Sequence, residues 1–384
     1  MTQTVGQYEL IRRIGHGGMA EVWMGRRASV GGAQKSVAIK FMSARVAGDE
    51  RHRRMFLAEA RLSMLMTHSN VVQVFDAGEE GGRLYLVMEW IDGLDLARLS
   101  ELRRREGRPW PPRLVAYVIG EVLQGLAYAH HLRHEGETQC VVHRDVSPHN
   151  ILITGDGMVK LIDFGLSLAR DRGKELTEPG IVKGKMSYLS PEIVSGQRPT
   201  PLSDQFAAGS VLWEALVGRK LFAGQTDYDV YKKLRDGQVQ PLRPLRRDTP
   251  RELTAVIHRA LSPEASQRFP SAREMASHLS QVLRNHRAPK DLHEMLGQSA
   301  AEARAGVARA DHDEEVSTTT PVADIELEAV ERAASGSARR KEEVTPPAGS
   351  RQRASRDTVQ AAERSDSEGP KRGLLHKLPF FWKR

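Results

Sequence analysis

Two short motifs near the middle of the chain hold residues that could transfer a phosphoryl group. Asp145 and Asn150 lie in the segment Val142–Asn150, and Asp163 lies in the segment Ile162–Gly165. The carboxylate of Asp145 could accept the proton of an attacking hydroxyl group. Asn150 and Asp163 offer hard oxygen ligands of the kind that Mg²⁺ prefers. These residue types predict a phosphoryl-transfer centre.

A glycine-rich turn upstream could hold the phosphates of a nucleotide. It contains Gly15, Gly17 and Gly18, between apolar runs at Tyr8–Ile14 and Val22–Met24 that are typical of strands. Glycine lets backbone N–H groups approach a phosphate because no Cβ stands in the way. Taken alone, the same turn could be an ordinary hairpin.

A lysine ends the next β-branched run, Val37–Lys40. Val37 and Ile39 alternate with Ala38 and Lys40, so one pair is expected to face the core and the other the nucleotide. A lone strand lysine is usually solvated. Here the order of the neighbouring motifs assigns Lys40 to the nucleotide.

In this order, the motifs resemble those of the bacterial branch of the eukaryotic-like (Hanks-type) Ser/Thr protein kinases. The resemblance covers roughly residues 8–285. It implies an α+β, two-lobed protein-kinase fold, with a small antiparallel β lobe that carries the αC helix at residues 8–91 and a mainly helical lobe at 92–285. It also implies ATP and Mg²⁺ as cofactors and proteins as substrates.

The resemblance gives each motif residue a role. Asp145 would be the catalytic base, Asn150 and Asp163 would hold Mg²⁺, and Lys40 would hold the α- and β-phosphates. The residues expected around the phosphates and the adenine ring are Ile14, Gly15, His16, Gly17, Gly18, Val22, Ala38 and Leu152. The third glycine of the family's loop is Ala20 in this chain.

Glu59 is the carboxylate expected to hold Lys40. The segment Arg51–Met66 predicts a helix with apolar residues at Met55, Leu62, Leu65 and Met66, and it resembles the family's αC helix. The alternative is a surface glutamate that pairs with Arg54 or Arg61, which would contribute only about 0.2–0.5 kcal/mol.

The apolar run Leu84–Ile91 resembles the last strand of the small lobe as it enters the hinge. Met88 would be the gatekeeper, and the carbonyl of Glu89 and the N–H of Ile91 would bind the adenine edge. Asp95 would contact the ribose, although it could equally cap the helix that follows.

Three residues further along the chain match positions that are structural in the family. Glu192, in the Pro191–Glu192 step, would pair with Arg268 under the substrate platform, and Asp204 would cap the catalytic-loop backbone. Small-molecule phosphotransferases with a kinase-like core generally lack this segment, so these residues favour a protein substrate.

Ser147 departs from the family pattern, because a lysine that neutralises the γ-phosphate is expected there. A threonine is also missing after Gly184, where the chain has Lys185. We hypothesise that the two side chains have exchanged places and that Lys185 supplies the missing charge. The alternatives are that Lys185 is a solvated loop residue and the enzyme slow, or that the chain is a catalytically weak or silent kinase-fold scaffold.

Arg144 precedes the base, which in this family marks kinases that are switched on by phosphorylation of the activation loop. Thr177 is the expected site, with Ser167 and Ser187 as alternatives. A phosphate there would pair with Arg144 and order the loop.

Composition restricts the other classes of function. Of the 384 residues, 40% are hydrophobic, but no run has the ~18 apolar residues of a membrane span. No signal peptide is recognised, and the single Cys140 suits a reducing cytoplasm, where we expect it to lie in or near the core. Nucleic-acid binding is disfavoured despite a net charge of +8, and the arginines at 103, 104, 105 and 108 are expected to form a solvated face or, less favourably, to dock an acidic substrate.

Residues 286–384 are expected to form a low-complexity, largely disordered tail, with a helix over Pro289–Ala308. Its end, Lys371–Arg384, mixes bulky apolar and cationic side chains. Such a segment could bind a docking partner or a membrane surface, or have no defined role.

Overall fold

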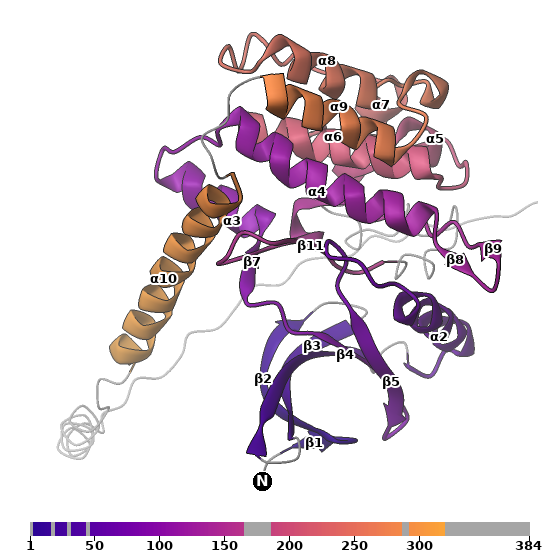
Figure 1. Cartoon of the computed structure of the whole chain (residues 1–384), viewed down its shortest axis with the longest axis vertical. Helices are drawn as coiled ribbons and strands as arrows, with labels where there is room; N and C mark the ends of the chain where they lie inside the picture. The colour runs from indigo at the N-terminus through magenta and orange to yellow at the C-terminus, as the bar shows by residue number, and fades with distance from the viewer. Residues whose placement is uncertain are drawn as a thin grey trace, which may run out of the picture. The chain divides into compact units, whose positions relative to one another are not determined.

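A six-stranded antiparallel sheet forms the first lobe, with the strands in the order β1-β2-β3-β4-β6-β5. In Figure 1 this sheet curls around itself. The strands are β1 Thr4–Val5, β2 Tyr8–His16, β3 Ala20–Ala28, β4 Gln34–Met42, β5 Val74–Glu80 and β6 Arg83–Glu89. This computed structural model describes residues 3–16, 20–28, 32–43, 47–164, 186–285 and 292–318, without the side chains of His16, Ala28, Glu59 and 307–318.

The alternation predicted for β4 is present in the sheet. Val37 and Ile39 are buried in one apolar cluster with Tyr8, whereas Ala38 belongs to a second cluster with Met88. Successive side chains of a strand point to opposite faces, so the two clusters lie on opposite sides of the sheet.

Helix α2 (Glu50–Met64) forms where a helix was predicted. The side chain of Asp49 caps it by accepting hydrogen bonds from the N–H groups of Arg51 and His52. Phe56 and Ala60 are buried in the cluster that contains Ala38. The predicted apolar face is only partly right, because Leu65 lies at the end of the helix and is exposed.

The second lobe is mainly helical, as predicted. Its helices are α3 Leu96–Arg105, α4 Pro112–His130, α5 Pro191–Val194, α6 Pro201–Val217, α7 Asp227–Arg235, α8 Arg251–Ala260 and α9 Ala272–Asn285. Helices α4 and α6 carry the most buried positions, which include Trp213 and Phe206. The predicted two-lobed kinase fold is therefore confirmed.

Short strands and turns carry the catalytic segments between the lobes. Strands β7 (Gly93–Asp95), β10 (Ile151–Thr154) and β11 (Val159–Leu161) form an antiparallel sheet in the order β11-β10-β7. The remaining short elements are strands β8 Arg133–His134 and β9 Glu137–Thr138 and the 3₁₀ turns η2 Pro148–Asn150, η5 Met186–Tyr188 and η6 Ala265–Gln267.

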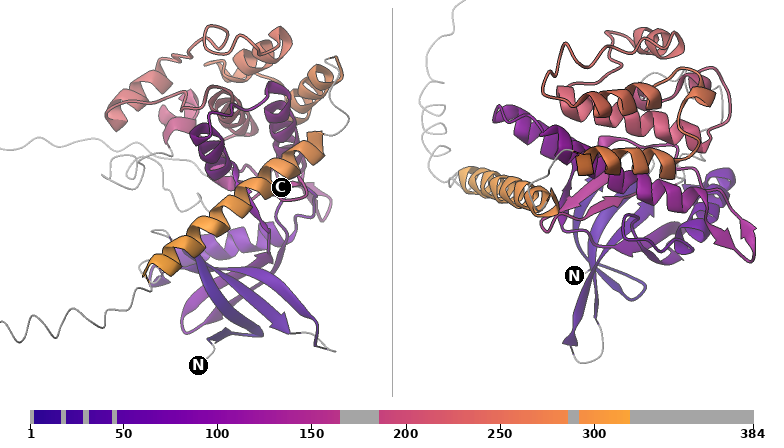
Figure 2. Two further views of the ribbon diagram at one scale, coloured as in Figure 1. Left: turned by 90° about the vertical axis from the view of Figure 1, so that its left-hand side faces the viewer. Right: turned by 45° about the horizontal axis from the view of Figure 1, so that its top comes forward.

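The last described helix, α10, runs from Leu292 to Thr318. A helix was predicted in this region, but the observed one continues ten residues past Ala308. It contacts α3, α4, β7 and β10, and both views of Figure 2 show it apart from α6 to α8. Residues 1–319 form one compact unit, whereas residues 320–384, with the predicted docking segment, lie outside the described residues.

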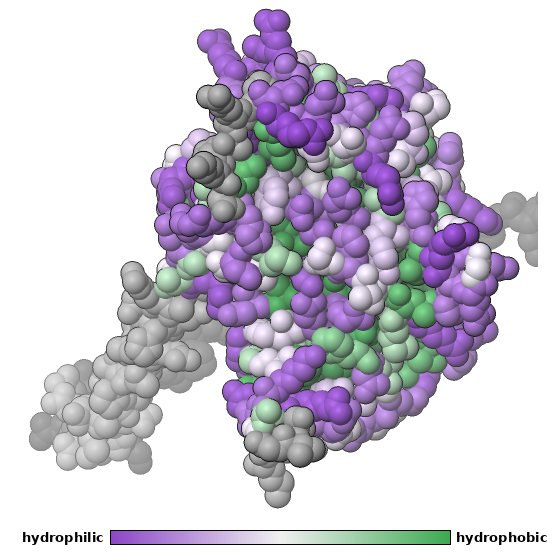
Figure 3. Space-filling model, in the orientation of Figure 1, coloured by the Kyte–Doolittle hydropathy of each residue, from purple (hydrophilic) through white to green (hydrophobic). Residues whose placement is uncertain are grey.

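The surface shown in Figure 3 is mostly hydrophilic, and its apolar residues are scattered in small groups. Within the described part of the chain, no helix is both long and apolar enough to cross a membrane.

Candidate active site

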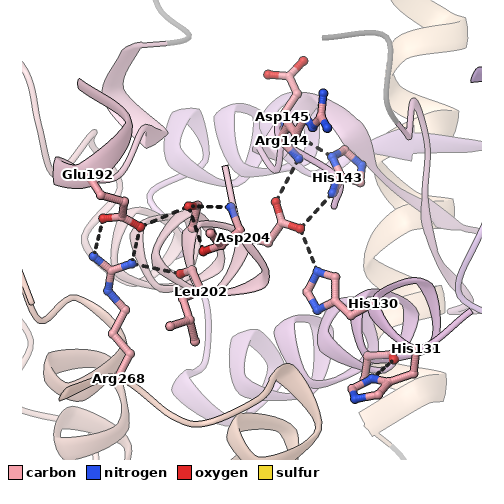
Figure 4. A network of polar contacts seen from close by, with 12 residues as sticks. His130, His131, His143, Arg144, Asp145, Glu192, Leu202, Asp204 and Arg268 are labelled. Atoms are coloured by element: carbon pink, nitrogen blue, oxygen red, sulfur yellow. Dashed lines mark hydrogen bonds and ion pairs between the residues drawn. The ribbon is translucent and has the colours of Figure 1, made fainter. Parts of the chain in front are cut away.

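Asp204 holds the backbone of the segment that carries Asp145. Its carboxylate accepts hydrogen bonds from the backbone N–H groups of His143 and Arg144, both at 2.8 Å, and from Nε2 of His130 at 2.8 Å (Figure 4). Asp204 lies in the first turn of α6, where the helix dipole favours a negative charge, and it is only 1% exposed. The predicted capping of the catalytic loop is confirmed.

The bonds from Asp204 stabilise an unfavourable backbone conformation. Arg144 has a φ angle of 70°, in the left-handed region that non-glycine residues rarely adopt. Such a residue costs about 1–3 kcal/mol and persists only when its surroundings hold it. Asp163, in the second motif, has a φ of 64° and shares this feature.

His143 joins the two motifs. The N–H of Asp145 donates to Nδ1 of His143 at 3.2 Å, so the other ring nitrogen, Nε2, carries the proton and donates to the carbonyl of Ile162 at 3.0 Å. Burial lowers the pKa of His143, which keeps the ring neutral. The role of His143 was not predicted, although the residue lies inside the motif, because its partner Ile162 is 19 residues away.

Asn150 is held against Asp145. Its amide nitrogen donates to the carbonyl of Asp145 at 2.7 Å and to the carboxylate of Asp145 at 3.1 Å. The backbone carbonyl of Asn150 accepts from the N–H of Ile162, which precedes Asp163. The structure thus brings together the three residues on which the phosphoryl-transfer prediction rests.

Lys40 reaches the same place from the first lobe. Its ammonium lies 2.7 Å from the carboxylate of Asp163, and the residue is only 4% exposed. Glu59 lies on α2, but its side chain is outside the described residues, so the Lys40–Glu59 pair stays a prediction. Lys40, Asp163 and Met88 line a cavity of about 20 Å³, so Met88 lies beside the site, and its role as gatekeeper stays a prediction.

The residues predicted around the nucleotide lie on facing strands. Gly15 is opposite Val22, and Val22 is opposite Lys40 in the sheet. Val22 and Ala38 belong to one apolar cluster with Met88 and Ile91, whereas Leu152 lies on β10 opposite Asp95.

Part of the predicted phosphate loop cannot be placed. Ile14 is partly exposed and the backbone of His16 pairs with Glu21. Gly17 and Gly18 lie outside the described residues.

Two side chains of the linker between the lobes make contacts, and one of these contacts, Glu89–Lys160, was not predicted from the sequence. Glu89, at the end of β6, accepts a hydrogen bond from Lys160 of β11 at 2.8 Å. Asp95 caps α3 by accepting from the N–H of Arg98 at 2.8 Å, which confirms the capping alternative, while a ribose contact stays a prediction. Interaction with Asp95 also raises the pKa of His149, whose Nδ1 is 3.7 Å away.

Glu192 and Arg268 form the predicted pair. The guanidinium binds both carboxylate oxygens, at 2.7 and 2.8 Å. Its other N–H groups donate to the carbonyls of Ser262, Leu202 and Pro263, so all five donors of Arg268 are used in a site where its side chain is 0% exposed. Figure 4 shows the bonds to Glu192 and Leu202.

A second buried polar pair, Tyr188 and Glu214, was not predicted. The hydroxyl of Tyr188 donates to Glu214 at 2.8 Å, and burial raises the pKa of both residues. A tyrosine and a glutamate that are 26 residues apart give no local sequence pattern from which their pairing could be predicted.

Ser147 is 2% exposed, and its hydroxyl has no hydrogen-bond partner among the described residues. Lys185, Gly184, Ser167 and Thr177 lie outside those residues. Ser187 is described and buried, so its hydroxyl is poorly accessible in this conformation.

Two predictions about individual side chains are wrong. Cys140 is exposed, because it follows the exposed β8–β9 hairpin and the chain returns to the core only from Val141 onward. Arg103 is 9% exposed instead of solvated, because its guanidinium packs 4.6 Å from the centre of the Trp110 ring and donates to Ser299 of α10.

Comparison with known proteins agrees with this geometry. The protein kinase domain family matches residues 8–279. The chain is 35% identical over 287 residues to the tyrosine-protein kinase MasK of Myxococcus xanthus, a match that covers 74% of this chain and 44% of MasK. It is 34% identical to the serine/threonine-protein kinase PknB of Mycolicibacterium smegmatis, over 72% of this chain and 43% of PknB.

A solved structure is similar to the same part of the chain. The kinase domain of PknI from Mycobacterium tuberculosis superposes with a TM-score of 0.56 at 26% identity, covering 73% of this chain and 97% of that domain. The match covers less than half of MasK or PknB, so it concerns their kinase domains. The chain belongs to the bacterial eukaryotic-like (Hanks-type) protein kinase family.

Proposed function

We propose that this chain is a protein kinase that transfers the γ-phosphate of ATP to serine and threonine hydroxyls of proteins. The observation that carries the proposal is the convergence of Lys40, Asp145, Asn150 and Asp163 on one site, with the loop of Asp145 held by Asp204. In this arrangement Asp145 accepts the proton of the substrate hydroxyl and Lys40 orients the phosphates. The Glu192–Arg268 pair, which belongs to the family's peptide platform, supports a protein substrate.

The residues present fit Mg²⁺. Asn150 and Asp163 supply an amide and a carboxylate oxygen, which are hard ligands, and both hydrogen bonds of the Asn150 side chain use its nitrogen, so its oxygen can serve as the ligand. When bound, the ion would neutralise charge on the transferred phosphate. In this structure, the ion pair between Lys40 and Asp163 holds both side chains in position.

Phosphate transfer is tested with the full chain, labelled ATP, Mg²⁺ and a generic basic protein. We expect labelled phosphoserine and phosphothreonine, and we expect Asp145→Asn to lower kcat by about 10²–10⁴-fold because a general base contributes that much. Phosphoamino-acid analysis decides the acceptor. Phosphotyrosine alone would refute the Ser/Thr assignment. The chain would then phosphorylate tyrosine, the acceptor that the name of MasK states for that protein.

The second candidate is a kinase-fold scaffold without turnover, favoured by Ser147 at the position of a family lysine. Such a chain would bind a fluorescent ATP analogue with normal saturation yet transfer no phosphate. The four retained residues, Lys40, Asp145, Asn150 and Asp163, make this candidate the weaker one.

We also propose that Lys185 supplies the charge that Ser147 lacks. The hydroxyl of Ser147 supports this, because it has no partner among the described residues. A buried polar group without a partner costs about 1–3 kcal/mol, which favours a donor from elsewhere in the chain, such as Lys185. A preorganised cation at developing phosphoryl charge is worth about 3–4 kcal/mol, so its removal should slow the reaction by more than a hundredfold.

A double-mutant cycle tests this exchange. We expect Lys185→Thr to lower kcat by more than a hundredfold, and Ser147→Lys to restore part of the loss in the double variant. The matched control is Lys183→Thr, which removes the same charge two residues away and should change kcat little. Additive effects of the two substitutions, or equal losses in Lys183→Thr and Lys185→Thr, would contradict the exchange.

Regulation by autophosphorylation of Thr177 is proposed on the basis of Arg144, whose backbone lies beside the catalytic Asp145. A phosphate on the activation loop would add an anion for this arginine to bind. Mass spectrometry of fully active enzyme should find Thr177 modified, and an unmodified Thr177 in such a sample would exclude the switch.

The remaining proposals concern the cellular context. A cytoplasmic location and a role in intracellular signalling are proposed from the single cysteine and from the family, and specific nucleic-acid binding is not expected. For Lys371–Arg384, a docking partner or a membrane surface stays proposed, and co-sedimentation of the tail with liposomes separates the two.

A further inference from the structure

Helix α10 lies beyond the family match at residues 8–279, yet it is packed into the kinase fold. Leu296 and Ala300 are 0% exposed and belong to the large core cluster that contains α4 and α6. Figure 1 shows the helix beside α3 and close to β7. A helix with fully buried positions in the main core is part of the folded domain.

The closest approach joins backbone to backbone. Gly297 of α10 faces the turn Gly155–Gly157, which connects β10 and β11. A Cβ on Gly297 would lie 2.8 Å from the carbonyl oxygen of Gly155 and 2.9 Å from the nitrogen of Gly157. A Cβ on Gly157 would in turn collide with the carbonyl of His293. Both positions therefore require glycine for the helix to dock.

Polar contacts connect α10 to three other elements. The hydroxyl of Tyr117 on α4 and Nδ1 of His293 are 3.2 Å apart, and Arg103 of α3 donates to Ser299 at 3.4 Å. Arg304 binds the linker between the lobes, because its guanidinium lies 2.5 Å from the carboxylate of Asp92 and donates to the carbonyl of the same residue at 3.4 Å.

The elements that α10 touches are those that place the catalytic residues. Asp92 follows Ile91, whose N–H is predicted to bind adenine. The turn Gly155–Gly157 connects β10, which begins directly after Asn150, to β11, which ends two residues before Asp163. A shift of this turn would therefore move both proposed metal ligands.

We propose that helix α10 holds the interlobe linker and the β10–β11 turn in position. The packing of this helix therefore determines the affinity of the kinase for nucleotide. Arg304 is a positioning residue for the linker. Its ion pair with Asp92 is largely exposed and contributes little to stability, so its effect is on the position of the linker. The inference rests on the proposed function, because the nucleotide is the substrate of that function.

Two glycines of the same helix give a matched test. Gly297→Ala introduces the clash, whereas Gly306→Ala places a Cβ where no atom lies within 4 Å, and both gain the same helix propensity. In the full chain, we expect Gly297→Ala to weaken the binding of a fluorescent ATP analogue by roughly fivefold, equivalent to about 1 kcal/mol. Hydrogen exchange should rise in residues 90–95 and 153–160. Gly306→Ala should leave both unchanged, and equal affinity and exchange in the two variants would overturn the proposal.

A surface charge reversal provides a second test that does not depend on packing. Arg304→Asp should raise KM for ATP with kcat and Tm nearly unchanged, and Asp92→Arg in the same chain should restore KM in part. A merely structural role would change Tm and give no such rescue, and an unchanged KM would refute the positioning role. If the wild-type chain transfers no phosphate, the proposed function fails, while analogue binding and hydrogen exchange still decide the role of α10.

Discussion

Replacing Asp204 with asparagine should reduce kcat by about a hundredfold, because an active-site displacement of about 1 Å can cost that much. The carboxylate now accepts from two backbone N–H groups and from His130. Asparagine has one oxygen and one NH₂ group, so at least one of these donors would face another donor. The strained backbone of Arg144 would lose its restraint, and Asp145 would move with it.

Steady-state kinetics of Asp204→Asn and Asp227→Asn provide the comparison. Asp227 also lies in the first turn of a helix, α7, but it is exposed, so its substitution removes the same charge without touching the catalytic loop. We expect Asp227→Asn to keep wild-type kcat. Retention of most activity in Asp204→Asn would show that the loop is held by other contacts.

Arg268→Ala should lower the free energy of unfolding by about 3–5 kcal/mol, the usual loss when one partner of a buried ion pair is removed. The substitution leaves the carboxylate of Glu192 and the carbonyls of Leu202, Ser262 and Pro263 without their donor. Urea denaturation measures the loss. Arg235→Ala is the control, because Arg235 pairs with Asp236 at an exposed site, where an ion pair contributes little to stability.

The pH dependence of this loss has a defined sign. In the wild type, burial raises the pKa of Glu192, but the bonds from Arg268 outweigh it and hold the pKa below its usual value. The stabilisation is therefore present above the ordinary glutamate pKa and is lost as the pH falls through the lowered value. In Arg268→Ala the bonds from Arg268 no longer offset burial, although the hydroxyl of Ser203 still donates to Glu192. The carboxyl of Glu192 should therefore protonate more readily, and the difference in stability between the two proteins should narrow toward acid pH. A difference independent of pH would exclude Glu192 as the source.

The sequence predicted the parts of the site whose geometry is local. Asp145 and Asn150 are five residues apart, and one 3₁₀ turn is enough to bring them together. The alternation in β4 follows from the two-residue period of a strand, which places the side chains of Val37 and Lys40 on opposite faces of the sheet. The resemblance to kinases supplied the long-range pair Glu192–Arg268, which spacing alone could not have indicated.

The residues that sequence reasoning misplaced depend on distant segments. Arg103 looked like one of several solvated arginines, and only Trp110 and Ser299, the latter 196 residues away, make it a buried residue. The ion pair of Glu89 with Lys160 likewise connects strands of different sheets. Such contacts have no local pattern, because each residue type is ordinary in its own segment.

The glycine contact of α10 also restricts which residues can occupy positions 157 and 297. Positions 157 and 297 meet through bare backbone, so a larger residue at either one is compatible only with release of the helix. One of the two lies inside the segment shared with other kinases, residues 8–279, and the other lies outside it. A variant truncated to the shared segment would therefore keep Gly157 and its turn but lose the helix that packs against it.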